Sequence, residues 1–160
     1  MNDFTLYDPI VAEKVTTEGI RIMNKLRKRL ELITVDFSQC QDLERDMVVQ
    51  LNDVFENVTS SRMKPRVNIG GDLVKMTSQR YKLFSKSTAC VTCGCDGTFF
   101  IKEKHRSDEL YHLNLYAIVD GFAVLMTKDH IMPKSKGGKN HLSNYQTMCQ
   151  PCNQEKADTV

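Results

Sequence analysis

The sequence lacks a long apolar segment, a signal peptide, internal repeats and low-complexity stretches. No apolar run approaches the ~20 residues needed to cross a bilayer, and the N-terminus has no basic region followed by an apolar one. We therefore predict a protein without membrane contact that stays in the cytoplasm, or in the host cytoplasm if it is viral. Its 160 residues, 41% of them hydrophobic, are sufficient for one ordinary core.

The chain also lacks a strong net charge. A formal charge of +2 and a pI near 8.2 are too mild to indicate nucleic-acid binding by themselves. Basic residues do gather locally, at 25–29, 62–66 and 134–139. Each of these clusters is also compatible with a solvated face, and for the first that is the preferred interpretation.

Residues 1–62 are predicted to be helical and carry no recognisable chemistry. Asp8 followed by Pro9 is typical of a helix start, and Ser38 with Gln41 has the spacing of a capping box. Two apolar sets recur at helical spacing, first Ile20, Met23, Leu26, Leu30 and Ile33, then Leu43, Met47, Leu51, Val54, Phe55 and Val58. The expected helix pair would pack on the rest of the chain, form a homodimer or dock on a larger assembly, and periodicity does not separate these options.

Residues 63–75 are predicted to form a connection with one short strand, because polar residues, Pro65, Gly70 and Gly71 interrupt any regular pattern. A second domain is predicted over 76–160. It would begin with a short helix over 78–85. Aromatic and β-branched residues between 97 and 127, with a turn signal at Asp120 and Gly121, predict strands and a hairpin. The fold class is therefore α+β.

The spacing of the cysteines indicates a metal-binding site. Four of the six cysteines form two C-x-x-C pairs, Cys90 with Cys93 and Cys149 with Cys152. Without an export signal, such pairs hold a metal or perform redox chemistry. One tight turn can present both sulfurs of a pair to one ion, so two pairs complete the tetrahedral shell of Zn²⁺. Such a site would join two segments that lie about 55 residues apart in the sequence. A redox disulfide is the alternative, and Cys40 and Cys95 are interpreted as non-ligands.

Polar residues interleaved with the cysteine pairs form a second pattern. They are Asp129 and His130, the turn residues Gly137 and Gly138, then Asn144 and Asn153. In residue type, order and spacing, residues 76–158 resemble an HNH nuclease of the ββα-metal type, in the form that carries Asn at the last position of the motif. Residues 1–75 carry no such resemblance.

The resemblance implies a fold and a set of roles. Asp129 and His130 would lie on a strand, followed by a loop, a second strand over 145–148, and a helix that starts near Pro151 and carries Asn153 in its first turn. His130 is the implied general base, and Asp129 and Asn153 are the implied ligands of Mg²⁺ or Mn²⁺. Asn144 would bridge the loop and so orient the histidine.

The implied function is metal-dependent hydrolysis of DNA phosphodiester bonds, with Zn²⁺ as a structural ion. Lys134, Lys136 and Lys139 would approach the phosphates, with a plain surface loop as the equal alternative. Two other functions stay open: a zinc-stabilised nucleic-acid-binding module that does not cut, and an assembly module. The stretch between Cys95 and Asp129 is longer than such a nuclease needs, so an extra hairpin is expected to extend the sheet.

Overall fold

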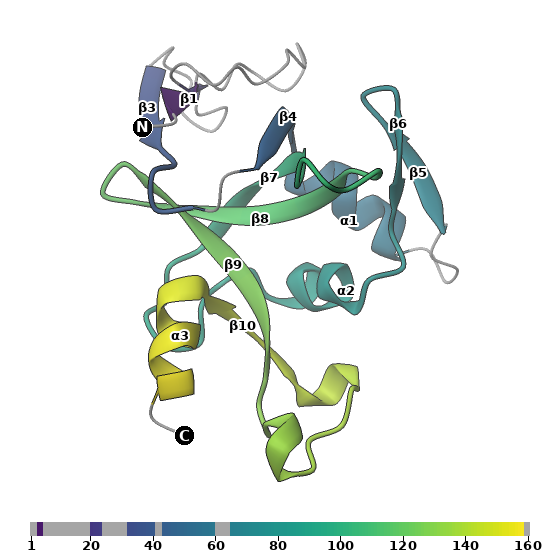
Figure 1. The fold of residues 1–160 in the computed structure, drawn as a ribbon, viewed down its shortest axis with the longest axis vertical. Helices are drawn as coiled ribbons and strands as arrows, with labels where there is room; N and C mark the ends of the chain where they lie inside the picture. The colour runs from purple at the N-terminus through teal and green to yellow at the C-terminus, as the bar shows by residue number, and fades with distance from the viewer. Residues whose placement is uncertain (1–2, 5–19, 24–31, 41–42, 60–64, 159–160) are drawn as a thin grey trace.

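The structure is a computed structural model, and it describes residues 3–4, 20–23, 32–40, 43–59 and 65–158. The elements are β1 (Asp3–Phe4), β2 (Ile20–Met23), β3 (Leu32–Asp36), β4 (Glu44–Val49), α1 (Leu51–Thr59), β5 (Arg66–Ile69), β6 (Asp72–Lys75), α2 (Gln79–Lys86), β7 (Gly97–Lys104), β8 (His112–Val119), β9 (Phe122–His130), η1 (Lys134–Lys136), η2 (Leu142–Asn144), β10 (Tyr145–Cys149) and α3 (Gln150–Asp158). Helices and strands are mixed along the chain, so the α+β class is confirmed (Figure 1).

One curled sheet organises these elements. Its strands follow the order β1-β2-β3-β9-β8-β7-β4, and β10 joins by pairing with β9. The pairing of β3 with β9 is parallel, and the other pairings in this sheet are antiparallel. A separate hairpin of β5 and β6 lies beside it. The expected extension of the sheet between Cys95 and Asp129 is confirmed, because β7, β8 and most of β9 come from that stretch.

Strand β9 connects the large sheet to the C-terminal elements. Its first half pairs with β8, from Phe122 to Leu125, and its second half pairs with β10, from Met126 to His130. In Figure 1 it runs from the sheet to the lower part of the molecule, where β10 and α3 lie. Because one continuous strand serves both parts, the end of β9 is held in place by the whole sheet.

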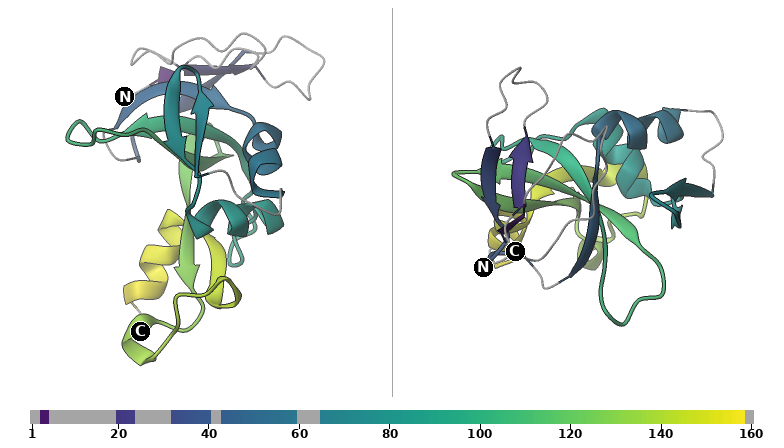
Figure 2. Two further views of the ribbon diagram at one scale, coloured as in Figure 1. Left: turned by 90° about the vertical axis from the view of Figure 1, so that its right-hand side faces the viewer. Right: turned by 90° about the horizontal axis from the view of Figure 1, so that it is seen from above.

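Strands β7 and β8 are buried on both faces. Phe100, Leu113 and Leu115 pack with residues of α1 and α2, which lie next to each other (Figure 2). Phe99 and Tyr116 point to the opposite face and pack with residues around β3. Burial on both faces accounts for the short apolar runs at 99–101 and 115–118, and it also buries polar residues that need partners, such as Lys102 and Glu103.

Paired charges also join β4 to this sheet. The ammonium of Lys102 lies 2.7 Å from Asp46 and 2.6 Å from Asp72, which links β7 to β4 and β6. Glu103 on β7 meets Arg45 at 3.2 Å, and burial raises the pKa of this carboxyl group. Each buried charge thus has an opposite partner.

The predicted helical character of residues 1–62 is wrong over most of the described residues. Strands β2, β3 and β4 occupy positions that the periodicity assigned to helices, and only α1 is helical. In β4 the residues Met47, Val48 and Val49 pair with β7, a tertiary contact that outweighs the local helical spacing. The predicted helix start at Asp8 and Pro9 lies outside the described residues.

Other expectations are confirmed. Helix α2 starts after Ser78, whose side chain accepts a hydrogen bond from the Arg80 N–H. The turn between β8 and β9 has left-handed backbone at Asp120 and Gly121, with φ of 52° and 83°.

The 63–75 connection differs from the prediction, because it contains two strands, β5 and β6, instead of one. The domain division at 62 and 76 stays a prediction. No helix of the described residues is long and apolar enough to cross a membrane.

Candidate active site and cysteine cluster

The four paired cysteines come together. The sulfur atoms of Cys90, Cys93, Cys149 and Cys152 all lie within 4.8 Å of one another. The first two come from the turn after α2, the third ends β10 and the fourth lies in the first turn of α3. This cysteine cluster therefore connects the start of α3 to a turn far away in the sequence.

The electrostatics of the cysteine cluster fit a metal ion. Burial opposes ionisation of Cys90, but the backbone N–H groups of Cys149, Cys93 and Thr92 donate to its sulfur and together lower its pKa to about 6. Burial raises the pKa of Cys149, and the neighbouring Cys149 thiol raises that of Cys152. Four thiolates at this spacing repel one another, and a divalent cation such as Zn²⁺ removes that repulsion.

The other two cysteines lie outside this cluster. Cys95 is half-buried, and the pKa of its thiol is raised by burial and by its hydrogen bond to the thiol of Cys93, so it borders the cluster without being one of its four members. Its backbone carbonyl accepts the N–H of Cys90 at 2.8 Å, which helps to close the turn. Cys40 packs on the opposite face of the sheet, where its thiol donates to the carbonyl of Ala123.

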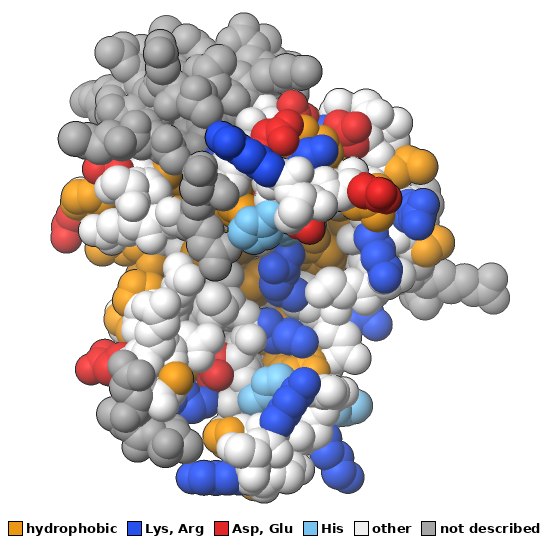
Figure 3. Space-filling view, viewed as in Figure 1, with side chains coloured by type: hydrophobic (Ala, Val, Ile, Leu, Met, Phe, Trp, Pro, Cys, Tyr) orange, Lys and Arg blue, Asp and Glu red, His pale blue; other side chains and the backbone are white. Residues whose placement is uncertain are grey.

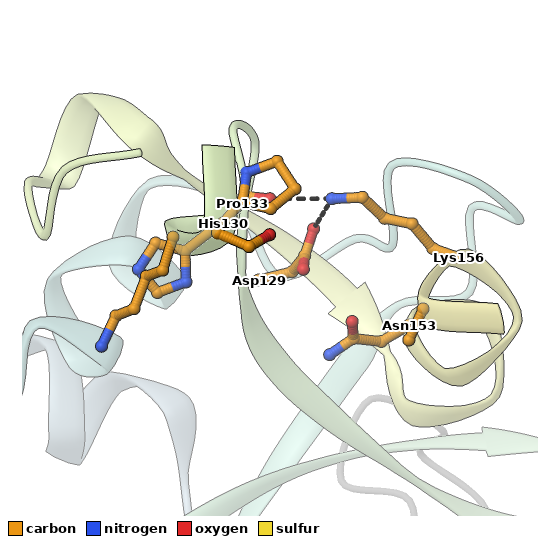
Figure 4. Close-up of a pocket in the computed structure, with 8 residues that line it drawn as sticks. Asp129, His130, Pro133, Asn153 and Lys156 are labelled. Atoms are coloured by element: carbon orange, nitrogen blue, oxygen red, sulfur yellow. Dashed lines mark hydrogen bonds and ion pairs between the residues drawn. The ribbon is translucent and has the colours of Figure 1, made fainter. Parts of the chain in front are cut away.

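Three of the four predicted catalytic residues, Asp129, His130 and Asn153, line one open pocket of about 430 Å³ (Figure 4), and Asn144 lines a neighbouring one. Asp129 and His130 end β9, while Asn153 and Lys156 lie one turn apart on α3. The complete lining is Asp129, His130, Pro133, Lys134, Ser135, Asn153, Lys156 and Ala157. Asp129 and His130 therefore meet Asn153 from a different element, in the order of strand, loop, strand and helix that the resemblance implies.

Two oxygen atoms in this pocket are suited to a cation. The Oδ2 atom of Asp129 accepts hydrogen bonds from Gln146 at 2.8 Å and from Lys156 at 2.6 Å, so its Oδ1 atom is the one available among the described residues. The amide nitrogen of Asn153 donates to the Thr127 hydroxyl at 3.1 Å. That hydroxyl itself donates to a backbone carbonyl, so it accepts from Asn153 and leaves the amide oxygen on the Asp129 side (Figure 4).

The imidazole of His130 is held on two sides. Its Nε2 atom lies 2.9 Å from the Oδ1 atom of Asn140. Its ring packs edge to face against the ring of Tyr145, with 4.9 Å between the two ring centroids. A carbonyl oxygen accepts only, so Nε2 carries the proton and Nδ1 keeps its lone pair. A neutral histidine in this tautomer can accept a proton at Nδ1.

Asn144 bridges the loop between β9 and β10. Its side chain bonds the N–H and the carbonyl of Met132 at 2.9 and 3.1 Å, and it also donates to the carbonyl of Lys139 at 3.0 Å. The structure thus places it across the loop, as the resemblance implies. The residue that accepts a hydrogen bond from the His130 ring is instead Asn140. The sequence does not single it out, because nothing in its spacing sets it apart from other loop residues.

Lys156 was missed as well. Its ammonium lies 2.6 Å from Asp129 Oδ2 and 2.7 Å from the His130 carbonyl, so it balances the carboxylate charge. A signal for it exists in the sequence, since residues three apart share a face of a helix and Asn153 is three positions earlier.

The three predicted phosphate-binding lysines are exposed on the same loop. Lys134 lines the pocket, whereas Lys136 and Lys139 lie farther along. No acidic residue occurs from His130 to Gln154. Figure 3 shows Lys, Arg and His side chains around the lower end of the molecule, so the surface beside the pocket is basic.

A comparison with known families assigns the C-terminal segment. The family profile described as HNH endonuclease matches residues 123–160, which begin within β9 and include the loop, β10 and α3. No curated protein and no solved structure matches the chain. The resemblance is therefore confirmed for residues 123–160, which carry the sequence pattern of an HNH endonuclease.

Proposed function

We propose that this protein is a metal-dependent endonuclease that hydrolyses DNA phosphodiester bonds, with a ββα-metal site built from β9, β10 and α3. The observation that carries the proposal is the meeting of Asp129, His130 and Asn153 in one open pocket, inside the segment that matches HNH endonucleases. Hydrolysis needs an activated water and positive charge beside the phosphate. This pocket offers a group for each.

His130 is the proposed general base. Its Nδ1 atom would take a proton from water as the water oxygen bonds to phosphorus and the bond to the 3′-oxygen breaks. The departing 3′-oxygen would take a proton from a solvent water, which leaves a 5′-phosphate and a 3′-hydroxyl. Asn140 would hold the proton on Nε2, so that Nδ1 stays free for this transfer. Asn144 would keep the loop closed around the histidine.

Asp129 and Asn153 are the proposed ligands of Mg²⁺ or Mn²⁺. Both offer oxygen atoms, which these hard cations prefer, and an open pocket leaves coordination positions for water and phosphate. Such an ion would neutralise charge on the phosphate and the leaving oxygen. Zn²⁺ is the proposed ion of the cysteine cluster, where four sulfur donors leave no position for substrate.

Plasmid cleavage tests this function. Supercoiled DNA should be nicked or linearised only after Mg²⁺ or Mn²⁺ is added to protein that has been freed of these two ions but keeps its zinc. His130→Ala should lower the rate by about 10²–10⁴-fold, the usual range for a lost general base. His105→Ala is the matched control, because His105 is an exposed histidine outside the pocket. Equal rates for the two variants would exclude His130 as the base.

The same assay separates the alternatives. A zinc-stabilised binding module would retain DNA on a gel without cutting it under any divalent ion. An assembly module would show neither binding nor cleavage by itself. The presence of a base and two oxygen donors in one pocket favours the nuclease over both.

A further inference from the structure

Basic residues gather in a part of the chain that precedes the segment matching HNH endonucleases. Residues 57–95 include seven Lys and Arg and a single acidic residue, Asp72, whereas the whole chain has 22 Lys and Arg against 20 Asp and Glu. The carboxylate of Asp72 lies 2.6 Å from the buried ammonium of Lys102. The proposed reaction uses none of the seven cations, so their concentration here has another cause.

The hairpin of β5 and β6 exposes two of these cations on one face. Val67 and Val74 are cross-strand partners on its inner face, where Val74 is fully buried. Arg66 and Lys75 are the next pair of partners, so they lie opposite each other on the outer face, and both are exposed. Like charges directly opposite each other destabilise a strand pair. An anion bound between them would remove this cost.

The hairpin is fixed to the rest of the molecule. The N–H of Met76 donates to the carbonyl of Pro65 at 3.0 Å and closes its open end. The ammonium of Lys102 on β7 donates to the carbonyl of Ile69 at 2.8 Å and holds the end that carries the turn. A surface fixed in this way loses little conformational freedom on binding, which favours a partner.

Helix α2 repeats the arrangement of the hairpin. Its apolar side is buried, while Lys82 and Lys86 are exposed and lie one helical turn apart. Like charges at this spacing destabilise a helix. Neither these two lysines nor Arg66 and Lys75 form an ion pair with an acidic side chain of the described residues. We refer to Arg66, Lys75, Lys82 and Lys86 as the basic strip.

The basic strip leads toward the candidate active site. Helix α2 packs against β9, β10 and η2, and the carbonyl of Ser87 at its end accepts a hydrogen bond from Thr147 on β10 at 2.7 Å. On β9 the ammonium of Lys128 lies 4.0 Å from the ring centre of Tyr145, and His130 packs against the same ring. Figure 3 shows Lys and Arg side chains both where Figure 1 draws the hairpin and α2 and at the lower end of this face.

We propose that the basic strip binds the phosphodiester backbone of DNA on one side of the bond that is cut. The inference rests on the proposed function, which it deepens by naming a DNA-binding surface outside the nuclease segment. Cations that neutralise backbone phosphates add affinity and position the DNA, but they do not read its sequence. The basic strip would therefore hold the substrate without selecting the cleavage position.

The salt dependence of DNA binding tests the basic strip. The probe is a random-sequence duplex, and the protein is the full chain with His130→Ala, so that binding is measured without cleavage. Adding Arg66→Gln with Lys75→Gln, or Lys82→Gln with Lys86→Gln, should lower the slope of log affinity against log salt by about 2 in each case. Binding in dilute salt should weaken about 10–100-fold. A hydroxyl-radical footprint should shorten on one side of the mapped cleavage position only.

The matched control adds Lys104→Gln with Arg106→Gln instead. This pair removes the same amount of charge, but Asp108 and Glu109 follow it closely in the sequence. The control should leave the slope and the footprint unchanged. Variants of the basic strip should melt at the original temperature or up to about 2 °C higher, because a repulsion between like charges has been removed.

Three results would overturn the inference. Equal changes in the control and in the strip variants would mean that only net charge matters. A clearly lower melting temperature in the strip variants would mean that these cations stabilise the fold. Unchanged DNA binding, with lost binding to vesicles of phosphatidylserine and phosphatidylcholine, would identify a membrane surface instead.

The binding and cleavage measurements fail separately. Cleavage by the intact protein, with the full salt slope in every strip variant, would remove the basic strip and keep the nuclease. A reduced slope in the strip variants, in a protein that cuts no DNA tested, would keep DNA binding by the strip and count against the proposed function.

Discussion

The cysteine cluster and the Asp129 pocket share one helix but differ in almost every property. Cys152 belongs to the cluster and Asn153, the next residue, belongs to the pocket. Consecutive helical residues point about 100° apart, so one turn of α3 can serve two sites. The cluster offers four sulfur atoms and has two buried members, whereas the pocket is open and offers a few oxygen atoms.

Under the proposed function, this difference separates a structural site from a reactive one. A cation surrounded by four protein ligands has no position for water, so it can only hold elements together. An ion held by two oxygen atoms keeps open positions for water and phosphate. The shared helix also makes the open site depend on the closed one, because loss of the cluster would release the turn that carries Asn153.

The largest expected effect comes from breaking the closed site. Cys93→Ser should remove bound zinc and lower the melting temperature by more than about 10 °C, because metal binding of this kind contributes directly to folding. Cys93 is exposed, so the change introduces no buried defect. Metal analysis and calorimetry measure the two effects.

Cys95→Ser is the matched control, since Cys95 follows two positions later and its thiol touches that of Cys93, but it is not one of the four cysteines of the cluster. It should keep one zinc per chain and a melting temperature within about 3 °C of the original. Similar losses in both variants would mean that the two sulfurs exchange roles. Brief chelation is a further test of this comparison. It should remove the ion of the open site and stop cleavage, and adding Mg²⁺ alone should restore cleavage.

Much of the site was predictable, because its residues lie in one local motif. Asp129 and His130 lie on a strand and Asn153 lies in the first turn of a helix, as the resemblance implies, and Asn144 bridges the loop as it also implies. The contacts of Asn140 depend instead on the three-dimensional path of the loop. Spacing along the chain carries no information about that path.

The fold was predictable where local patterns and tertiary contacts agree. Helix α2, the strands from β7 to β9 and the turn at Asp120 follow local propensity, and the structure contains them. Strand β4 was missed because its partner β7 lies about fifty residues later, and pairing over that distance leaves no local periodicity. A helical pattern that includes Met47 is real in the sequence, yet the helix begins only at Leu51.

A smaller effect is expected within the open site when the histidine loses its orientation. Asn140→Ala should lower kcat about tenfold and leave KM nearly unchanged, because the histidine remains but its tautomer is no longer fixed. Nitrogen NMR with labelled histidine should show His130 shifting from the Nε2-protonated form to a mixture. The chain has four histidines, so the His130→Ala spectrum assigns the signal.

Asn57→Ala is the control for this change. Asn57 also donates a hydrogen bond to a nearby carbonyl, that of Asp53, but it lies on α1 away from the pocket. An equal fall in kcat for both variants, or an unchanged His130 spectrum in Asn140→Ala, would show that Asn140 acts only on general stability.

The smallest effect concerns the charge already present in the open site. Lys156 places an ammonium 2.6 Å from Asp129 Oδ2, close to the oxygen atoms proposed to hold a divalent ion. Like charges a few ångströms apart near a protein surface repel by about 1–4 kcal/mol, and salt reduces this. Lys156→Met should therefore tighten Mn²⁺ binding about 3–10-fold at low salt, measured by electron paramagnetic resonance. Lys139→Met, a lysine outside the pocket, should leave it unchanged. Weaker Mn²⁺ binding in Lys156→Met would reverse the interpretation. It would mean that Lys156 helps the site more by holding Asp129 in place than it harms the site by repelling the cation. The open site would then resemble the cysteine cluster, because both would need protein contacts to be preformed.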